Sequence, residues 1–136
     1  MMAYYKNMKV LGIDFGTKNV GVATSDVEGK VAFPKTIVKR DDDLMSSIKK
    51  IAETEDAHQI VLGIPKNVEE EWQKEVTNFQ DELKKEGFVV ELQDESFSSH
   101  EAHQSAYGIG LKLNETDAVA AAFILQRYLD KQHGNN

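Results

Sequence analysis

Apolar residues gather in three short stretches near the start of the chain. Residues 8–14, 20–25 and 31–38 are rich in Val and Ile, which favour β-strands. Turn-forming residues separate the stretches, first at 16–19, where Gly16 permits a positive φ, and then at 26–29. Three consecutive strands joined by short turns predict an antiparallel meander.

Beyond residue 40, apolar positions at helical spacing alternate with short apolar runs. Leu44, Ile48 and Ile51 fit one face of a helix, and the aspartates at 41–43 precede it, where the helix dipole favours negative charge. Each helix between two strands lets the second strand return parallel to the first. The next predicted elements are a strand at 58–64, a helix with the stripe Trp72, Val76, Phe79 and Leu83 that stops at Gly87, and a strand at 88–92.

Two helices complete the predicted order. Residues 98–101 form a capping box that starts one of them. The last helix spans 116–131, and the apolar and small residues at 118–125 surround its axis, which predicts burial against the sheet. The predicted fold class is therefore α/β, with a mixed five-stranded sheet of three antiparallel and then parallel strands, flanked by helices on both faces.

The length of 136 residues fits one domain. We expect an N-terminal extension at 1–7, a single domain at 8–132 and a C-terminal tail at 133–136. The absence of cysteine excludes disulfides, thiolate metal sites and a cysteine nucleophile. No apolar run is long enough to span a bilayer, and the first residues lack the apolar core of a signal peptide. These features predict a cytoplasmic protein without a membrane partner.

The formal net charge of −7 argues against a protein that holds nucleic acid through a generally basic surface. The charge is uneven, however. Residues 1–40 carry seven Lys or Arg and three acids, a balance of +4, whereas residues 41–136 carry nine and twenty, a balance of −11. A polyanion should therefore approach the first part. The candidate contacts are Lys18, Lys30, Lys35, Lys39 and Arg40, although scattered surface lysines often serve solubility alone.

Three carboxylates occupy positions that suggest chemistry. Asp14 lies near the end of an apolar strand, where an unpaired carboxylate is costly without a cation or a catalytic proton. Glu95 follows the fifth strand, and Asp117 lies in the first turn of the last helix. If the first and fourth strands are neighbours in the sheet centre, these acids converge. Carboxylates so close together repel one another without a cation, and such oxygen-rich sites suit Mg²⁺ or Mn²⁺.

Structural explanations for the same residues stay open. Taken singly, the three acids also fit a polar hairpin tip, a solvated turn and a helix N-terminus. Ser98 and Ser99 are better explained as helix caps than as nucleophiles, because no base is evidently placed beside them. We expect His100 to lie on the surface.

Four segments of the sequence resemble motifs, and they occur in this order along the chain: GIDFGTKNVGVA at 12–23, VLGIP at 61–65, DESFSSHEA at 94–102 and DAVAAAFILQRYL at 117–129. Together they resemble the motifs of the bacterial YqgF/RuvX family over nearly the whole chain after Asn7. The resemblance implies a ribonuclease H-like fold and a cytoplasmic, metal-dependent nuclease, described either as a pre-16S rRNA processing enzyme or as a Holliday junction resolvase. Asp14, Glu95 and Asp117 fall on the acidic positions of that family.

The chain departs from the family pattern at two places. Ser96 stands where the family usually carries an arginine, which can bind a phosphate through two hydrogen bonds. Lys66 or Lys18 can replace part of that role. The loop at 68–72 is acidic where relatives often have small residues, and it would repel a substrate backbone. The expected substrate-binding residues are Thr17, Lys18, Lys66 and Asn67.

The predicted mechanism follows from these assignments. Asp14 bridges two divalent ions, and Glu95 and Asp117 hold one each. An activated water attacks the phosphorus in line and leaves a 5′-phosphate and a 3′-hydroxyl, while Lys18 steadies a phosphate oxygen. The expected substrate is structured RNA, foremost the 5′ end of pre-16S rRNA, with branched DNA as the alternative.

Two other functional classes stay open. A module that keeps the fold but binds nucleic acid or a ribosome precursor without cleaving it agrees with the acidic balance and with Ser96. The segment DFGT at 14–17 also resembles the first phosphate hairpin of the actin, hexokinase and heat-shock ATPases, which need a second such domain. We expect a monomer or a homodimer, because resolution of a symmetric junction needs two active sites.

Overall fold

The computed structural model of the chain describes residues 8–64, 68–94 and 116–134. The elements in chain order are β1 (Lys9–Phe15), β2 (Asn19–Ser25), β3 (Ala32–Lys39), α2 (Leu44–Glu55), β4 (Ala57–Ile64), α3 (Glu70–Lys85), β5 (Val89–Asp94) and α5 (Thr116–Gln132). Each strand and helix predicted within these ranges is present, and β5 extends to Asp94 instead of ending at residue 92. The helix predicted to begin at 98–101 lies outside the described residues.

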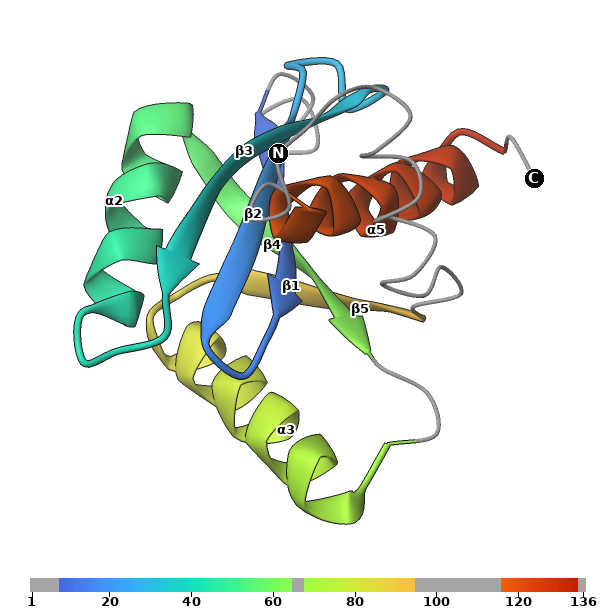
Figure 1. Cartoon of the computed structure of the whole chain (residues 1–136). Helices are drawn as coiled ribbons and strands as arrows, with labels where there is room; N and C mark the ends of the chain where they lie inside the picture. Colours follow the sequence, from blue (N-terminus) through green and yellow to red (C-terminus); the bar gives the residue numbers. More distant parts are fainter. Residues whose placement is uncertain (1–7, 65–67, 95–115, 135–136) are drawn as a thin grey trace.

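The five strands form one mixed sheet in the order β3-β2-β1-β4-β5 (Figure 1). β2 pairs antiparallel with both β1 and β3, whereas β4 pairs parallel with both β1 and β5. The predicted meander and the predicted parallel strands are thus confirmed, and the first and fourth strands are neighbours at the centre. Because β1, β4 and β5 run in the same direction, their carboxyl ends meet at one end of the sheet.

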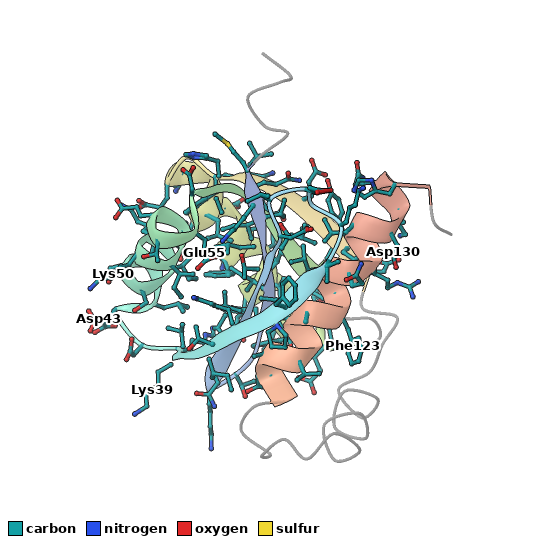
Figure 2. The ribbon with its side chains drawn as sticks, turned by 90° about the horizontal axis from the view of Figure 1, so that it is seen from above. Lys39, Asp43, Lys50, Glu55, Phe123 and Asp130 are labelled. Atoms are coloured by element: carbon teal, nitrogen blue, oxygen red, sulfur yellow. The ribbon has the colours of Figure 1, made fainter. Side chains whose placement is uncertain are left out.

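The two faces of the sheet are covered by different helices, so that the sheet lies between α2 and α5 (Figure 2). Side chains of α2 and α3 pack on one face around Ile13, Phe15 and Leu62. α5 packs on the other face around Ala23. Since successive strand residues point to opposite faces, Asp14, between Ile13 and Phe15, faces the side of α5.

The helices bury the stripes that the sequence predicts. Leu44, Ile48 and Ala52 of α2 are buried against the sheet. α3 buries Val76, Phe79 and Leu83 on the same face, and Gly87 follows its end with a φ of 97°. None of the helices in the described part of the chain has the length and apolar character to cross a membrane.

The turn between β1 and β2 differs from its prediction in one respect. Gly16 does not adopt a positive φ, which among the described glycines occurs at Gly29, Gly87 and Gly134. Its amide donates a hydrogen bond of 3.0 Å to the carbonyl oxygen of Asn19, and a Cβ at Gly16 would collide with that oxygen. The turn therefore needs glycine for close approach of the backbone and not for its φ angle.

Glu55 connects the end of α2 to three strands. Its Oε1 accepts hydrogen bonds from Lys9 Nζ at 3.0 Å and from Thr24 Oγ1 at 3.3 Å, and its Oε2 lies 3.0 Å from Lys35 Nζ. The residue is buried, and the hydrogen bonds from Lys9 and Lys35 lower the pKa of its carboxyl below the ordinary value. The ionised carboxylate thus fixes α2 against β1, β2 and β3.

Candidate active site

Asp14 and Asp117 come together on the face of the sheet that α5 covers. Asp14 is the cross-strand partner of Gly21, and the Cα atoms of such a pair are about 5 Å apart with side chains on the same face. The carbonyl oxygen of Asp117, in the first turn of α5, occupies the space that a Cβ on Gly21 would need. The structure therefore brings two of the three predicted acids to one glycine from opposite ends of the chain.

Small residues on β1 and β2 let the backbone of α5 approach the sheet. A Cβ on Gly12 would lie 2.7 Å from the Cβ of Leu125 and 2.9 Å from the carbonyl oxygen of Ala121. Gly21 makes the equivalent approach one turn earlier, at Asp117. Because positions 117, 121 and 125 are four residues apart, they lie on one face of the helix. The close approach at Gly12 and Gly21 fixes the position of Asp117 relative to β1.

The β1–β2 turn, which follows Asp14 closely in the chain, presents Thr17 and Lys18 to solvent. The backbone of the turn is closed by the hydrogen bond between Gly16 and Asn19. The amide of Arg40 donates to the carbonyl oxygen of Lys18 at 2.9 Å and ties the turn to the end of β3. The two predicted substrate contacts thus stand on a backbone that is hydrogen-bonded on both sides.

Arg40 supports the same turn from the opposite face of the sheet. Its guanidinium carbon lies 4.4 Å from the ring centre of Phe15 and 5.4 Å from that of Trp72, and both distances suit cation–π contacts. Its Nη2 lies 2.5 Å from Glu75 Oε1, and its Nη1 donates to the carbonyl oxygen of Gly16 at 3.5 Å. In this structure Arg40 holds the turn against α3.

The structure does not describe all of the predicted residues. Glu95, Lys66 and Asn67 lie outside the described residues. Asp94, the last residue of β5, is described: its neighbour Gln93 is buried and pairs with Gly63 on the side of α5. By the alternation along the strand, Asp94 points to the side of α2 and α3, away from the face that holds Asp14.

The donor atoms present suit a hard divalent cation. Within residues 8–64, 68–94 and 116–134, no three His, Asp or Glu side chains are grouped closely enough to hold a metal ion. The pair of Asp14 and Asp117 offers carboxylate oxygens only. Mg²⁺ is commonly bound through one or two carboxylates while it keeps several waters, whereas Zn²⁺ favours histidine and cysteine. The site therefore fits the predicted Mg²⁺ or Mn²⁺.

From the sequence, Arg40 was only a candidate contact for a polyanion and Gly21 had no assigned role, so the structural roles of both residues were not predicted. Gly21 lies inside an apolar strand, where a glycine often marks the close approach of another backbone, so a usable signal was present. The role of Arg40 had no such signal. Its partners Phe15, Trp72 and Glu75 belong to β1 and α3, and only the folded chain shows that they meet.

The chain is similar in sequence to known proteins over nearly its whole length. The sequence profile of the family described as "RuvX: Holliday junction resolvase" matches residues 8–131. A protein of Nitratidesulfovibrio vulgaris described as "Putative pre-16S rRNA nuclease" is 38% identical over 133 residues, with 90% of this chain and 94% of that protein covered. One of the same description from Maridesulfovibrio salexigens is 36% identical over 132 residues, with 90% and 98% covered.

Solved structures share the fold. RuvC of Thermus thermophilus in complex with a Holliday junction substrate has a TM-score of 0.60 at 16% identity, with 94% of this chain and 97% of that chain covered. The fowlpox virus resolvase in complex with Holliday junction DNA has a TM-score of 0.60 at 14% identity, with 92% and 99% covered. These likenesses confirm the predicted ribonuclease H-like fold. The profile match over residues 8–131, together with relatives that are 36–38% identical over 90% of the chain, shows that the chain belongs to the RuvX family.

Proposed function

We propose that this protein is a metal-dependent endonuclease that processes the 5′ end of pre-16S rRNA in the cytoplasm. The observation that carries the proposal is the meeting of Asp14 and Asp117 at Gly21. The relatives described as pre-16S rRNA nucleases support RNA as the substrate, because this chain covers 94% and 98% of their lengths. We assign the nuclease domain to residues 8–132, with 1–7 and 133–136 as flanking segments.

In this proposal Asp14 and Asp117 hold Mg²⁺ or Mn²⁺, and Glu95 supplies a third carboxylate. Glu95 directly follows Asp94, the last residue of β5, in the sequence. β5 ends at the same end of the sheet as β1. When bound, such ions supply the activation of water and the stabilisation of the leaving oxygen that phosphodiester hydrolysis requires.

The residues of the chain orient the substrate for that chemistry. Asp14 is held in place because its neighbours Ile13 and Phe15 are buried in the core on the opposite face. Thr17 and Lys18, on the hydrogen-bonded turn, contact the phosphate backbone beside the scissile bond. Further contacts are assigned to Lys66 and Asn67.

Cleavage of four-way DNA is the second candidate. It is favoured by the family description and by the junction complexes of the two structural neighbours. This activity would require two active sites and hence a homodimer, whereas RNA processing is open to a monomer. Light scattering of the purified protein, alone and with a four-way junction, separates the two requirements.

The proposal is tested by cleavage of an RNA that spans the 5′ end of 16S rRNA and its precursor sequence, with Mg²⁺ or Mn²⁺. Wild-type protein is expected to release a product with a 5′-phosphate, and Asp14→Asn and Asp117→Asn are expected to lose that activity. Asp42→Asn, an exposed surface change before α2, is the matched control and should cleave as wild type does. Equal rates for Asp14→Asn and wild type would contradict the proposal. Binding without cleavage by wild type would favour the non-catalytic module.

A further inference from the structure

The basic residues of the first part of the chain differ in whether an acid neutralises them. Four of the six in residues 8–40 form ion pairs: Lys9 and Lys35 both with Glu55, Lys30 with Glu28, and Arg40 with Glu75. Within the described part of the chain, Lys18 and Lys39 have no carboxylate within 4.0 Å, and both are exposed. The positive charge that can attract a polyanion is therefore concentrated on these two lysines.

Lys39 stands on the face of the sheet that holds the acids. Val38 pairs with Val20 and packs into the core on the side of α2 and α3. The next residue, Lys39, therefore points to the side of α5, as its cross-strand partner Asn19 does. Figure 2 shows the Lys39 side chain leaving the end of β3 for solvent, well apart from Lys50 on α2.

The strand register also places Lys39 near the candidate active site. Asp14, Gly21 and Ile37 form one row across β1, β2 and β3. Lys39 lies two residues beyond Ile37, so its Cα is roughly 12 Å from that of Asp14 by strand spacing and rise per residue. A strand of a nucleic-acid helix rises about 3.4 Å per nucleotide. Lys39 is therefore placed to contact a phosphate a few nucleotides away from the scissile bond at Asp14.

Lys18 and Lys39 belong to one connected piece of backbone. The carbonyl oxygen of Lys18 accepts its 2.9 Å hydrogen bond from the amide of Arg40, the residue directly after Lys39. The Arg40 side chain is in turn fixed by Phe15, Trp72 and Glu75 on the opposite face. The backbone that carries the two lysines is thus held by this hydrogen bond and by the packing of Arg40, so it needs little ordering when a ligand binds.

We propose that Lys39 is a substrate-binding residue that, together with Lys18, contacts the phosphate backbone of the nucleic acid on the β3 side of the active site. This inference rests on the proposed nuclease function, because it takes the polyanion to be the substrate. Phosphate contacts of this kind fix the register of the chain on its substrate and carry no sequence preference. Lys9 and Lys35 are excluded from the contact because Glu55 neutralises both.

The test is the binding of a fluorescein-labelled 20-nucleotide single-stranded RNA, followed by anisotropy in EDTA between 50 and 200 mM salt. Lys39→Ala is compared with Lys50→Ala, which removes the same charge from an exposed position on α2. Lys39→Ala should weaken binding roughly three- to tenfold and lower the slope of log K against log salt by about 0.7. Lys50→Ala should bind as wild type does, and Lys39→Arg should retain most of the affinity.

Equal affinities of Lys39→Ala and Lys50→Ala would overturn the assignment of Lys39, and so would a wild-type protein that does not bind the RNA. Failure of the nuclease proposal has a different signature. It would appear as cleavage that does not depend on Asp14, while the binding difference between the two lysine variants persisted. Cleavage that depends on Asp14, combined with equal binding of the variants, would remove Lys39 alone.

Discussion

The carbonyl oxygen of Asp117 lies where a side chain on Gly21 would have to be. Gly21 is also the cross-strand partner of Asp14. The absence of a side chain at this one position therefore sets how closely the two acids approach. A methyl group there would have to lift the start of α5 from the sheet.

Gly21→Ala is expected to weaken Mn²⁺ binding and to destabilise the fold by about 1–3 kcal/mol, because an extra carbon in a filled space forces the backbone to shift. Calorimetric titration and urea unfolding measure the two effects. The control is Gly29→Ala, whose Cβ meets open space but whose φ of 69° is unfavourable for alanine. Gly29→Ala should lower the free energy of unfolding by about 1–2 kcal/mol and leave the Mn²⁺ affinity unchanged. Unchanged Mn²⁺ affinity of Gly21→Ala would show that Gly21 does not position Asp117.

Arg40→Ala is expected to lower the free energy of unfolding by about 1–2 kcal/mol, because the guanidinium stacks on Phe15 and Trp72 and pairs with Glu75. Trp72 is the single tryptophan, so its fluorescence reports the loss of the contact directly. Glu75→Gln removes the ion pair and keeps the stacking, and its effect should be under about 1 kcal/mol. A larger loss for Glu75→Gln than for Arg40→Ala would mean that the ion pair, and not the stacking, dominates.

The Glu55 network predicts a loss of stability in acid. Hydrogen bonds from Lys9 and Lys35 lower the pKa of Glu55 in the folded state. Its stabilising contribution is therefore complete above the pKa of the unfolded chain, about 4.3, and is lost as the pH falls through the lower folded pKa. In urea unfolding between pH 6 and pH 3, Glu55→Gln should be less stable than wild type at pH 6, and the difference should shrink toward pH 3. Glu53→Gln, at an exposed position of α2, should follow the wild-type curve.

Gln126 links α5 to the β2–β3 hairpin through side-chain hydrogen bonds. Its Oε1 accepts from the amide of Ala32 at 2.8 Å, and its Nε2 donates to the carbonyl oxygen of Lys30 at 2.9 Å and to Asp130 at 3.0 Å. Gln126→Ala should lower the free energy of unfolding by about 1–2 kcal/mol and speed hydrogen exchange at the Ala32 amide. Thr77→Ala on α3 is the control and should leave that amide protected. Unchanged exchange at Ala32 in Gln126→Ala would contradict the link.

Much of the architecture is predictable from the sequence because the local patterns agree with one another. Val and Ile content marks the strands, helical spacing marks Leu44 and Ile48 of α2, and the helices between strands require parallel returns. The pairing of β1 with β4 at the centre of the sheet then follows. These are the features that the structure confirms.

The remaining features depend on distances between elements that no local pattern encodes. Gly16 was expected to provide a positive φ, whereas it allows a close approach to Asn19. The stacking of Arg40 on Phe15 requires the end of β3 to lie beside β1 and α3. Likewise, the basic residues become distinguishable only when Glu55 is seen to neutralise two of them.

We propose that Asp14 and Asp117 share a divalent cation. Calorimetric titration with Mn²⁺ of wild type, Asp14→Asn, Asp117→Asn and the double variant tests it directly, with Asp42→Asn as the surface control. We expect saturable binding by wild type and the control, a loss of about tenfold or more in each single variant, and little further loss in the double variant, because the two residues act on one site. Single variants that bind Mn²⁺ as tightly as Asp42→Asn would contradict it.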